Sequence, residues 1–124
     1  MNSITKEYGS WIGSMKWDQF LTIRKRPFSS KRILRTITES IFDTDKTLDR
    51  LFFVTERSND HNNFHTHILT SSPKQSTTTK TLLKLKGLDV WDEPVKDNEG
   101  VSIYLSKWIG QPNVTDYDLL IRED

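Results

Sequence analysis

The sequence predicts an α+β fold, built from one antiparallel sheet with flanking helices. Stretches rich in alternating aromatic and β-branched residues, typical of strands, are interspersed with stretches whose apolar residues recur at helical spacing. Two of the strand-like stretches follow each other across a short polar loop, and a connection of that length joins antiparallel neighbours. A length of 124 residues suits one compact core. We therefore expect a single domain over residues 1–124.

The first strand is expected over Asp18–Arg24, because successive side chains there suit opposite faces of a sheet. A proline shortly afterwards ends this strand. Ser29 or Ser30 can cap a helix that runs through Phe42. The apolar side chains of this helix recur at helical spacing and form one stripe, which consists of Ile33, Leu34, Ile37, Ile41 and Phe42.

Two further strands are expected over Leu51–Arg57 and Phe64–Thr70, joined as an antiparallel hairpin. A helix over Gln75–Lys86 would then turn three leucines inward, Leu82, Leu83 and Leu85.

The last part of the chain predicts a short strand over Val90–Val95, a helix from about Glu99 to Ile109, and a final strand over Asp118–Ile121. The resulting order is β-α-β-β-α-β-α-β. It resembles the split βαβ or ferredoxin-like folds.

The composition excludes several kinds of site. No apolar run approaches the roughly 18 residues that a membrane span needs. The chain has no cysteine, so disulfides, thiolate zinc sites and cysteine nucleophiles are excluded. A metal would have to bind His, Asp, Glu or amide oxygens. The start of the sequence also lacks the pattern of a secretory signal, so we expect a cytoplasmic protein, in the host cell's cytoplasm if it is viral.

The formal net charge of +1 conceals an asymmetry. Residues 1–88 hold 15 Lys and Arg against 8 Asp and Glu, whereas residues 89–124 hold 3 against 9. The densest basic stretch lies between Arg24 and Arg35, and a second lies between Lys74 and Lys86. The basic part could bind a polyanion or could be an ordinary solvated face.

His65 and His67 are two residues apart on a predicted strand, so both imidazoles face the same way. Glu56 lies near the end of the preceding strand, and antiparallel pairing can place it beside them. Two imidazoles and a carboxylate suit a divalent ion, with zinc, manganese and magnesium all conceivable. The alternative is a pair of half-buried polar residues with no ligand.

Tyr104 and Lys107 lie three residues apart on the expected helix Glu99–Ile109, which brings a phenol and an ammonium onto one face. A phenol attacks phosphorus well only when positive charge or a base favours its deprotonation. Lys107 could serve that purpose or stabilise charge on a phosphate. A tyrosine at the edge of the core is the alternative.

Together these features resemble the HUH endonuclease superfamily, in particular the Rep proteins that initiate rolling-circle replication of plasmids and small DNA viruses. Three motifs, spread over most of the chain, are similar to those of the family: Phe20-Leu21-Thr22-Ile23, His65-Thr66-His67, and Tyr104-Leu105-Ser106-Lys107. Glu56, nine residues before His65, is similar to the additional acidic ligand of circovirus-like Reps. Thr66 departs from the family, which prefers a bulky apolar residue there.

The resemblance implies an RRM-like or ferredoxin-like sheet, with Glu56, His65 and His67 binding Mg²⁺ or Mn²⁺. It implies that Tyr104, assisted by Lys107, attacks single-stranded DNA and becomes linked to its 5′-phosphate. The implied partners are DNA at an origin or hairpin and a host or viral helicase and polymerase. The implied assembly is a monomer or homodimer without a membrane.

Three alternatives stay open: an HUH transposase, a non-enzymatic single-stranded nucleic-acid-binding domain of ferredoxin-like fold, and an inactivated Rep-like protein. His61 could be a fourth ligand or a phosphate contact. Tyr117 could be a second catalytic tyrosine or a strand-edge aromatic. Among the tryptophans that could stack on bases, Trp17 is the first to test.

Overall fold

The computed structural model describes residues 11–12, 14–58, 63–72, 78–95 and 114–122. The expected helix over Glu99–Ile109, with Tyr104 and Lys107, lies outside these residues, as does His61. Within them the fold is α+β, with five strands in one sheet and two helices of eight residues or more, as expected from the sequence.

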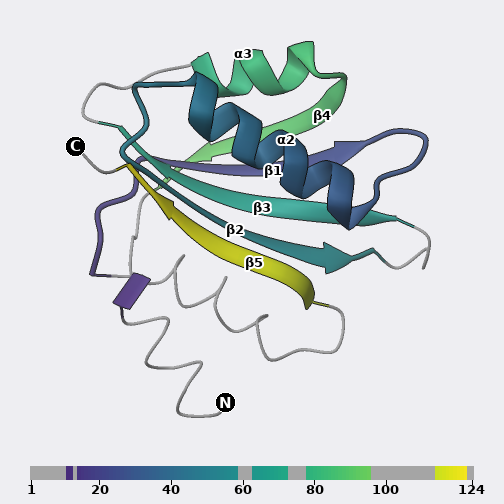
Figure 1. The fold of residues 1–124 in the computed structure, drawn as a ribbon, viewed down its shortest axis with the longest axis horizontal. Coiled ribbons are helices and arrows are strands. Elements are labelled where there is room, and N and C mark those ends of the chain that lie inside the picture. The colour runs from purple at the N-terminus through teal and green to yellow at the C-terminus, as the bar shows by residue number, and fades with distance from the viewer. Residues whose placement is uncertain (1–10, 13, 59–62, 73–77, 96–113, 123–124) are drawn as a thin grey trace.

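The strands are antiparallel throughout and lie in the order β4-β1-β3-β2-β5. β2 and β3 form the expected hairpin at the centre, and β4 and β5 lie at the two edges (Figure 1). The bounds are β1 Gln19–Lys25, β2 Arg50–Arg57, β3 Phe64–Ser71, β4 Leu88–Pro94 and β5 Val114–Ile121. β5 is longer than the strand expected over Asp118–Ile121 because its whole length pairs with β2.

Helices α2 (Lys31–Thr44) and α3 (Thr78–Leu85) cover the same face of the sheet (Figure 1). Ser30 caps α2 as expected, because its side chain accepts a hydrogen bond from the backbone N–H of Ile33. α3 ends before Gly87, whose φ of 80° suits glycine, and the chain turns there into β4. The main core lies under these helices and includes Leu21, Ile23, Leu34, Ile41, Leu51, Phe53, Ile68 and Leu83.

A second, smaller core lies on the opposite face of the sheet. The short segment containing Ile12 packs there against Phe52, Val54 and Leu69. Trp17 belongs to this core: the residue is 2% exposed, and its Nε1 donates a hydrogen bond to the carbonyl of Ile12. The suggestion that Trp17 stacks on bases is therefore wrong, because its ring faces are covered by protein.

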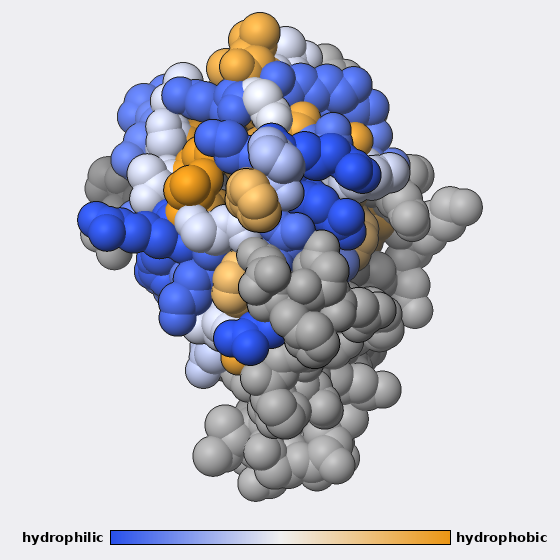
Figure 2. All heavy atoms as spheres, turned by 90° about the vertical axis from the view of Figure 1, so that its right-hand side faces the viewer, coloured by the Kyte–Doolittle hydropathy of each residue, from blue (hydrophilic) through white to orange (hydrophobic). Residues whose placement is uncertain are grey.

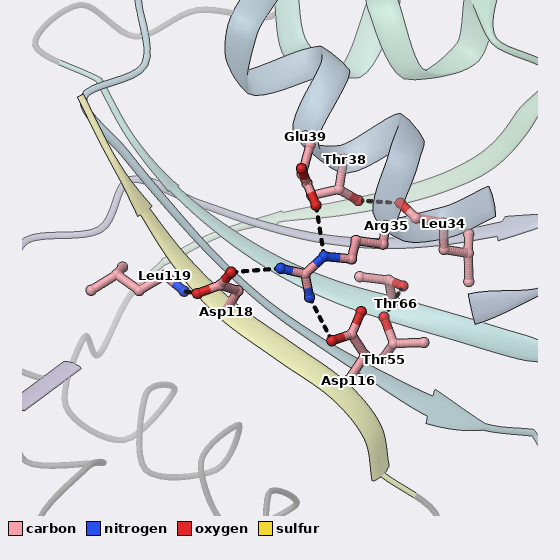
Figure 3. Close-up of polar contacts among 9 residues, drawn as sticks. All are labelled: Leu34, Arg35, Thr38, Glu39, Thr55, Thr66, Asp116, Asp118 and Leu119. Carbon is pink, nitrogen blue, oxygen red and sulfur yellow. Dashed lines mark hydrogen bonds and ion pairs between the residues drawn. The ribbon is translucent and has the colours of Figure 1, made fainter. Parts of the chain in front are cut away.

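An arginine ties α2 to the edge strand β5. Arg35 donates to Asp116 and Asp118 of β5 at 2.6 and 2.7 Å, and to Glu39 of its own helix at 2.6 Å (Figure 3). Its guanidinium also lies 5.4 Å from the centre of the Phe53 ring. This Arg35 cluster joins residues more than 80 positions apart in the sequence.

Two expected core residues are exposed instead. Leu85 is 77% exposed because it stands in the last turn of α3, where the chain already leaves the sheet for Gly87. Ile33 is 39% exposed at the first turn of α2, and Thr38 takes a buried place on that helix, donating its hydroxyl to the carbonyl of Leu34.

Among the described residues, no helix has the length and apolar character required to cross a bilayer.

Candidate metal centre

Three side chains that could bind a metal ion meet on the face of the sheet opposite α2 and α3. His65 and His67 project from β3 on the same side, and Glu56 of β2 is the direct cross-strand partner of His65. The neighbours on this face belong to the smaller core, including Val54, which pairs with His67. The hairpin register therefore brings the three predicted side chains together.

One carboxylate oxygen lies against both imidazoles. Glu56 Oε1 is 2.5 Å from His65 Nε2 and 3.4 Å from His67 Nε2. One ligand atom from each of the three residues lies within 4.8 Å of the others. Bonds of about 2.0–2.2 Å from nitrogen or oxygen to a small cation place neighbouring ligand atoms roughly 3 Å apart. The donor set therefore fits a divalent ion with small side-chain adjustments.

The other nitrogen of each imidazole is held by a hydroxyl group. His67 Nδ1 is 3.0 Å from Thr22 Oγ1 of β1, and His65 Nδ1 is 2.9 Å from Ser58 Oγ just past β2. A hydroxyl can donate or accept, so it can hold either tautomer of a neutral imidazole. When Nε2 binds a metal, Nδ1 carries the proton and donates to the hydroxyl, an arrangement usual around metal-bound histidines.

The site is largely shielded from water. The side chains of Glu56 and His67 are 12% exposed, and that of His65 is 17% exposed. Burial lowers the pKa of His67 to about 4, and the nearby His65 adds to the effect, while Glu56 partly opposes it. His67 is thus neutral at pH 7, which is the form that binds a metal.

Aromatic packing fixes the orientation of the His67 ring. Phe20 of β1 stacks on it, with ring centres 5.8 Å apart and planes 28° from parallel. The His65 ring stands edge-on to it at 4.9 Å. The predicted motif around Thr22 therefore contributes in two ways, since Phe20 packs on the imidazole and Thr22 bonds to it.

Thr66, between the two histidines, points to the helix-covered face. It is fully buried and shares a 2.7 Å hydrogen bond with Thr55, its cross-strand partner (Figure 3). Thr66 stands where the HUH family prefers a bulky apolar residue. Its buried hydroxyl finds a hydrogen-bond partner in the hydroxyl of Thr55, so the polar group is not left unpaired.

A β-bulge adjoins the acidic ligand. Thr55 pairs with Asp116 of β5, but the next residue, Glu56, pairs with Val114, so Thr115 is an extra residue in the ladder. The extra residue reverses the alternation: Asp116 faces Arg35, whereas Val114 packs in the smaller core with Val54. Bulges commonly adjoin functional sites because they bend a strand.

Arg24 extends the same face from β1. It lies two residues beyond Thr22, so its side chain emerges on the side of the metal centre. Its Nε is buried and has no hydrogen-bond partner among the described residues. A buried, unsatisfied guanidinium nitrogen is costly, and an anion would relieve this cost.

The structure describes one further predicted site residue, Tyr117. Tyr104, Lys107 and His61 lie outside the described residues. Tyr117 is 44% exposed on the edge strand β5 and pairs with Val54. Its surroundings are those of a strand-edge aromatic.

Ser58 is a site residue that the sequence analysis missed. It follows Glu56 by two positions, so the alternation that groups His65 with His67 also places Ser58 on the side of Glu56. The signal in the sequence is a polar residue two positions after Glu56. Because Ser58 is also the first residue of the polar loop after the strand, its contact with His65 was not predicted.

No protein-family model, curated protein or solved structure matches this chain. Its function must therefore be inferred from the chemistry of the site.

Proposed function

We propose that the chain is a metal-dependent endonuclease that nicks single-stranded DNA through a covalent tyrosine intermediate, as HUH Rep proteins do. The observation that carries the proposal is the contact of Glu56 Oε1 with Nε2 of both His65 and His67. Hydroxyl groups hold both Nδ1 atoms, so both imidazoles are oriented before a cation binds.

The topology supports a ferredoxin-like arrangement for this activity. Among the described residues, the elements from β1 to β4 run β-α-β-β-α-β, which is the order of the split βαβ fold. Both helices lie on one face, which leaves the metal ligands on the other (Figure 1). The histidine strand β3 is the middle strand of the sheet, so paired strands hold it on both sides.

Glu56, His65 and His67 would hold Mg²⁺ or Mn²⁺, and zinc is a third choice for the same ligands. When bound, the cation supplies positive charge that polarises a phosphodiester. The protein's own contribution is to keep His67 neutral and both imidazoles fixed in a site with little exposure to water.

Tyr104 would be the nucleophile. Its phenolic oxygen, after losing its proton, would form a bond to phosphorus while the bond from phosphorus to the 3′-oxygen breaks. The 3′-oxygen takes up a proton and leaves as a hydroxyl, and the 5′-phosphate stays on the tyrosine. Lys107 would assist the deprotonation or stabilise charge on the phosphate. The reverse reaction rejoins the strand without an external energy source.

The charge around the site supports a polyanionic substrate. β1 ends at Lys25, and Arg26, Lys31 and Arg32 follow at the end of the sheet where Glu56 and His65 lie. Figure 2 faces this end of the molecule and shows a mostly hydrophilic surface with separate apolar patches. Arg24, with its unsatisfied Nε, would bind a phosphate next to the metal centre.

The test is a search for a covalent adduct. The protein is incubated with pooled single-stranded hairpin and linear oligonucleotides and Mn²⁺, and a denaturing gel is inspected for a protein–DNA band. We expect a band with the wild type and with Tyr117→Phe, a matched tyrosine on β5. We expect none with Tyr104→Phe, with Glu56→Gln, or in EDTA.

The controls separate catalysis from binding. Tyr104→Phe should bind the oligonucleotides as tightly as the wild type, because only the nucleophilic oxygen is lost. If the wild type binds the substrates and never forms an adduct, the chain is a non-enzymatic binding domain. A band that survives Tyr104→Phe would assign the nucleophile to another residue.

A further inference from the structure

A surface pocket of about 440 Å³ lies beside the edge strand β4, where α3 turns into the sheet. We call it the β4 pocket; it is lined by Arg26, Lys84, Leu88, Asp89, Val90 and Trp91. None of these residues belongs to the metal centre. The pocket therefore requires a separate explanation.

Trp91 offers an accessible aromatic surface in this pocket. It is 52% exposed, whereas Trp17 is buried in the smaller core. An exposed indole face is a stacking surface for a planar, uncharged ring such as a nucleobase.

The sheet register connects Trp91 to the metal centre. Thr22 of β1 pairs with His67 on one side and with Trp91 on the other. These three residues therefore form one row across three adjacent strands, on the same face of the sheet. Adjacent strands are separated by about 4.8 Å, so the backbones of His67 and Trp91 are about 10 Å apart. A strand with one phosphate at the metal centre can reach Trp91 with a neighbouring nucleotide.

The charges of the pocket suit a phosphate. Arg26 and Asp89 form an ion pair with each other. Lys84 forms no ion pair with another described residue, and Lys80 at the other end of α3 is paired with Asp92 at 2.7 Å. The charge of Lys84 also helps to lower the pKa of Asp92, but Lys84 has no direct ion pair among the described residues, so its ammonium can contact a phosphate at the β4 edge.

We propose that the β4 pocket binds a nucleotide of the single-stranded DNA that occupies the metal centre. Trp91 stacks on its base, and Lys84 contacts its phosphate. This inference rests on the proposed function for the identity of the strand. A single strand is required because the bases of a duplex are already stacked on each other and cannot cover the indole.

The test measures binding without cleavage. A fluorescein-labelled oligo(dT) is titrated with protein in EDTA and followed by anisotropy, so neither nicking nor the metal contributes. We expect Trp91→Ala to bind about tenfold more weakly, the lower part of the range for losing one base stack. Lys84→Ala should lower the slope of log K against log salt by about 0.7, the value for one phosphate contact in a single strand.

Trp11→Ala is the matched control, because Trp11 is 49% exposed and lies in the short segment at the lower left of Figure 1, away from the β4 pocket. It should leave the affinity unchanged. The Mn²⁺ affinity of Trp91→Ala should equal that of the wild type, which shows that the metal centre is intact.

Intrinsic fluorescence gives a second readout. Oligo(dT) should quench the wild type and Trp11→Phe, and should quench Trp91→Phe much less. The proposal is overturned if Trp91→Ala binds like the wild type, if the wild type binds no single strand, or if free thymidine monophosphate or duplex DNA quenches Trp91 as efficiently as oligo(dT). If the wild type forms no covalent adduct but the Trp91 variants still bind single strands more weakly, the proposed nuclease activity is rejected and the proposed nucleotide-binding pocket is retained.

Discussion

At the scale of single residues, the hydroxyl groups behind the histidines distinguish this cluster from a chance group of polar side chains. Thr22 lies on β1 and Ser58 just past the end of β2, and each bonds to the Nδ1 of one imidazole. Both Nε2 atoms therefore point at Glu56. Partners of this kind commonly change metal affinity by 10–100-fold when they are mutated.

Thr22→Val should accordingly weaken Mn²⁺ binding about 10–100-fold, because the valine keeps the shape of the side chain and removes the hydrogen bond to His67. Isothermal titration calorimetry measures the affinity. Thr22→Ser restores the hydroxyl and should recover most of the affinity. Equal affinities in Thr22→Val and the wild type would mean that the hydroxyl plays no part in holding the ligand.

Acid should destabilise the metal-free protein through His67. Its pKa is about 4 in the folded chain and about 6.5 when unfolded, so only the unfolded state takes up the proton between these values. The free energy of unfolding should therefore fall as the pH drops through this window and level off below about pH 4. We expect a loss of about 2 kcal/mol between pH 7 and pH 5 from this group.

Urea titrations in EDTA at pH 7 and pH 5 measure that loss. His67→Gln has no imidazole and should show a smaller difference between the two pH values. An equal difference in both proteins would assign the acid sensitivity to other groups.

At the scale of secondary-structure elements, the Arg35 cluster determines how the edge strand β5 is held. β5 pairs with one neighbour, β2, and on its helix-covered side Asp116 and Asp118 bond to Arg35. The Arg35 side chain is 36% exposed, so water screens each ion pair and lowers its contribution. The packing of the guanidinium on Phe53 adds to the stabilisation that Arg35 provides.

Arg35→Met should lower the free energy of unfolding by about 1–2 kcal/mol, because several partly exposed carboxylates lose their shared cation. Urea denaturation measures the change, which should shrink at high salt. Arg32→Met removes an exposed arginine from the same helix and should have little effect. A similar loss in both variants would indicate a general effect of helix charge.

The elements with strong periodicity could be predicted from the sequence. The hairpin of β2 and β3 followed from aromatic and β-branched residues on both sides of a polar loop, and α2 followed from its serine cap and apolar stripe. The register of that hairpin brings Glu56 to the two histidines, so their proximity could also be predicted.

Other features depend on contacts that periodicity does not encode. The exposure of Leu85 follows from where α3 leaves the sheet, and the burial of Trp17 follows from the segment around Ile12. The pairing of Arg35 with Asp116 requires knowing that β5 lies beside β2. The contact of Thr22 with His67 likewise requires the order of the strands.

At the scale of the whole molecule, the cluster of Glu56, His65 and His67 spans two neighbouring strands at the centre of the sheet. A cation bound to Glu56, His65 and His67 would link β2 to β3 in the folded state. The unfolded chain lacks this arrangement, so binding of the cation should raise the melting temperature of the protein.

Mn²⁺ at about 100 times its dissociation constant should stabilise the wild type by about 2.7 kcal/mol, and the melting temperature should rise by several degrees. Differential scanning fluorimetry with Mn²⁺ and with EDTA measures the shift. Glu56→Gln should show little shift, whereas Asp43→Asn, an exposed acidic site on α2, should behave like the wild type. A shift that persists in Glu56→Gln would place the ion elsewhere.

The bulge at Thr115 also determines how this chain can change in length. Deleting Thr115 would restore regular alternation and still leave Val114 and Asp116 on their present faces. Its hydroxyl is buried and has no hydrogen-bond partner among the described residues, so the deletion breaks no side-chain hydrogen bond of this residue there. β5 can thus lose this residue without a slip of register, and the shorter strand would differ in its bend beside Glu56.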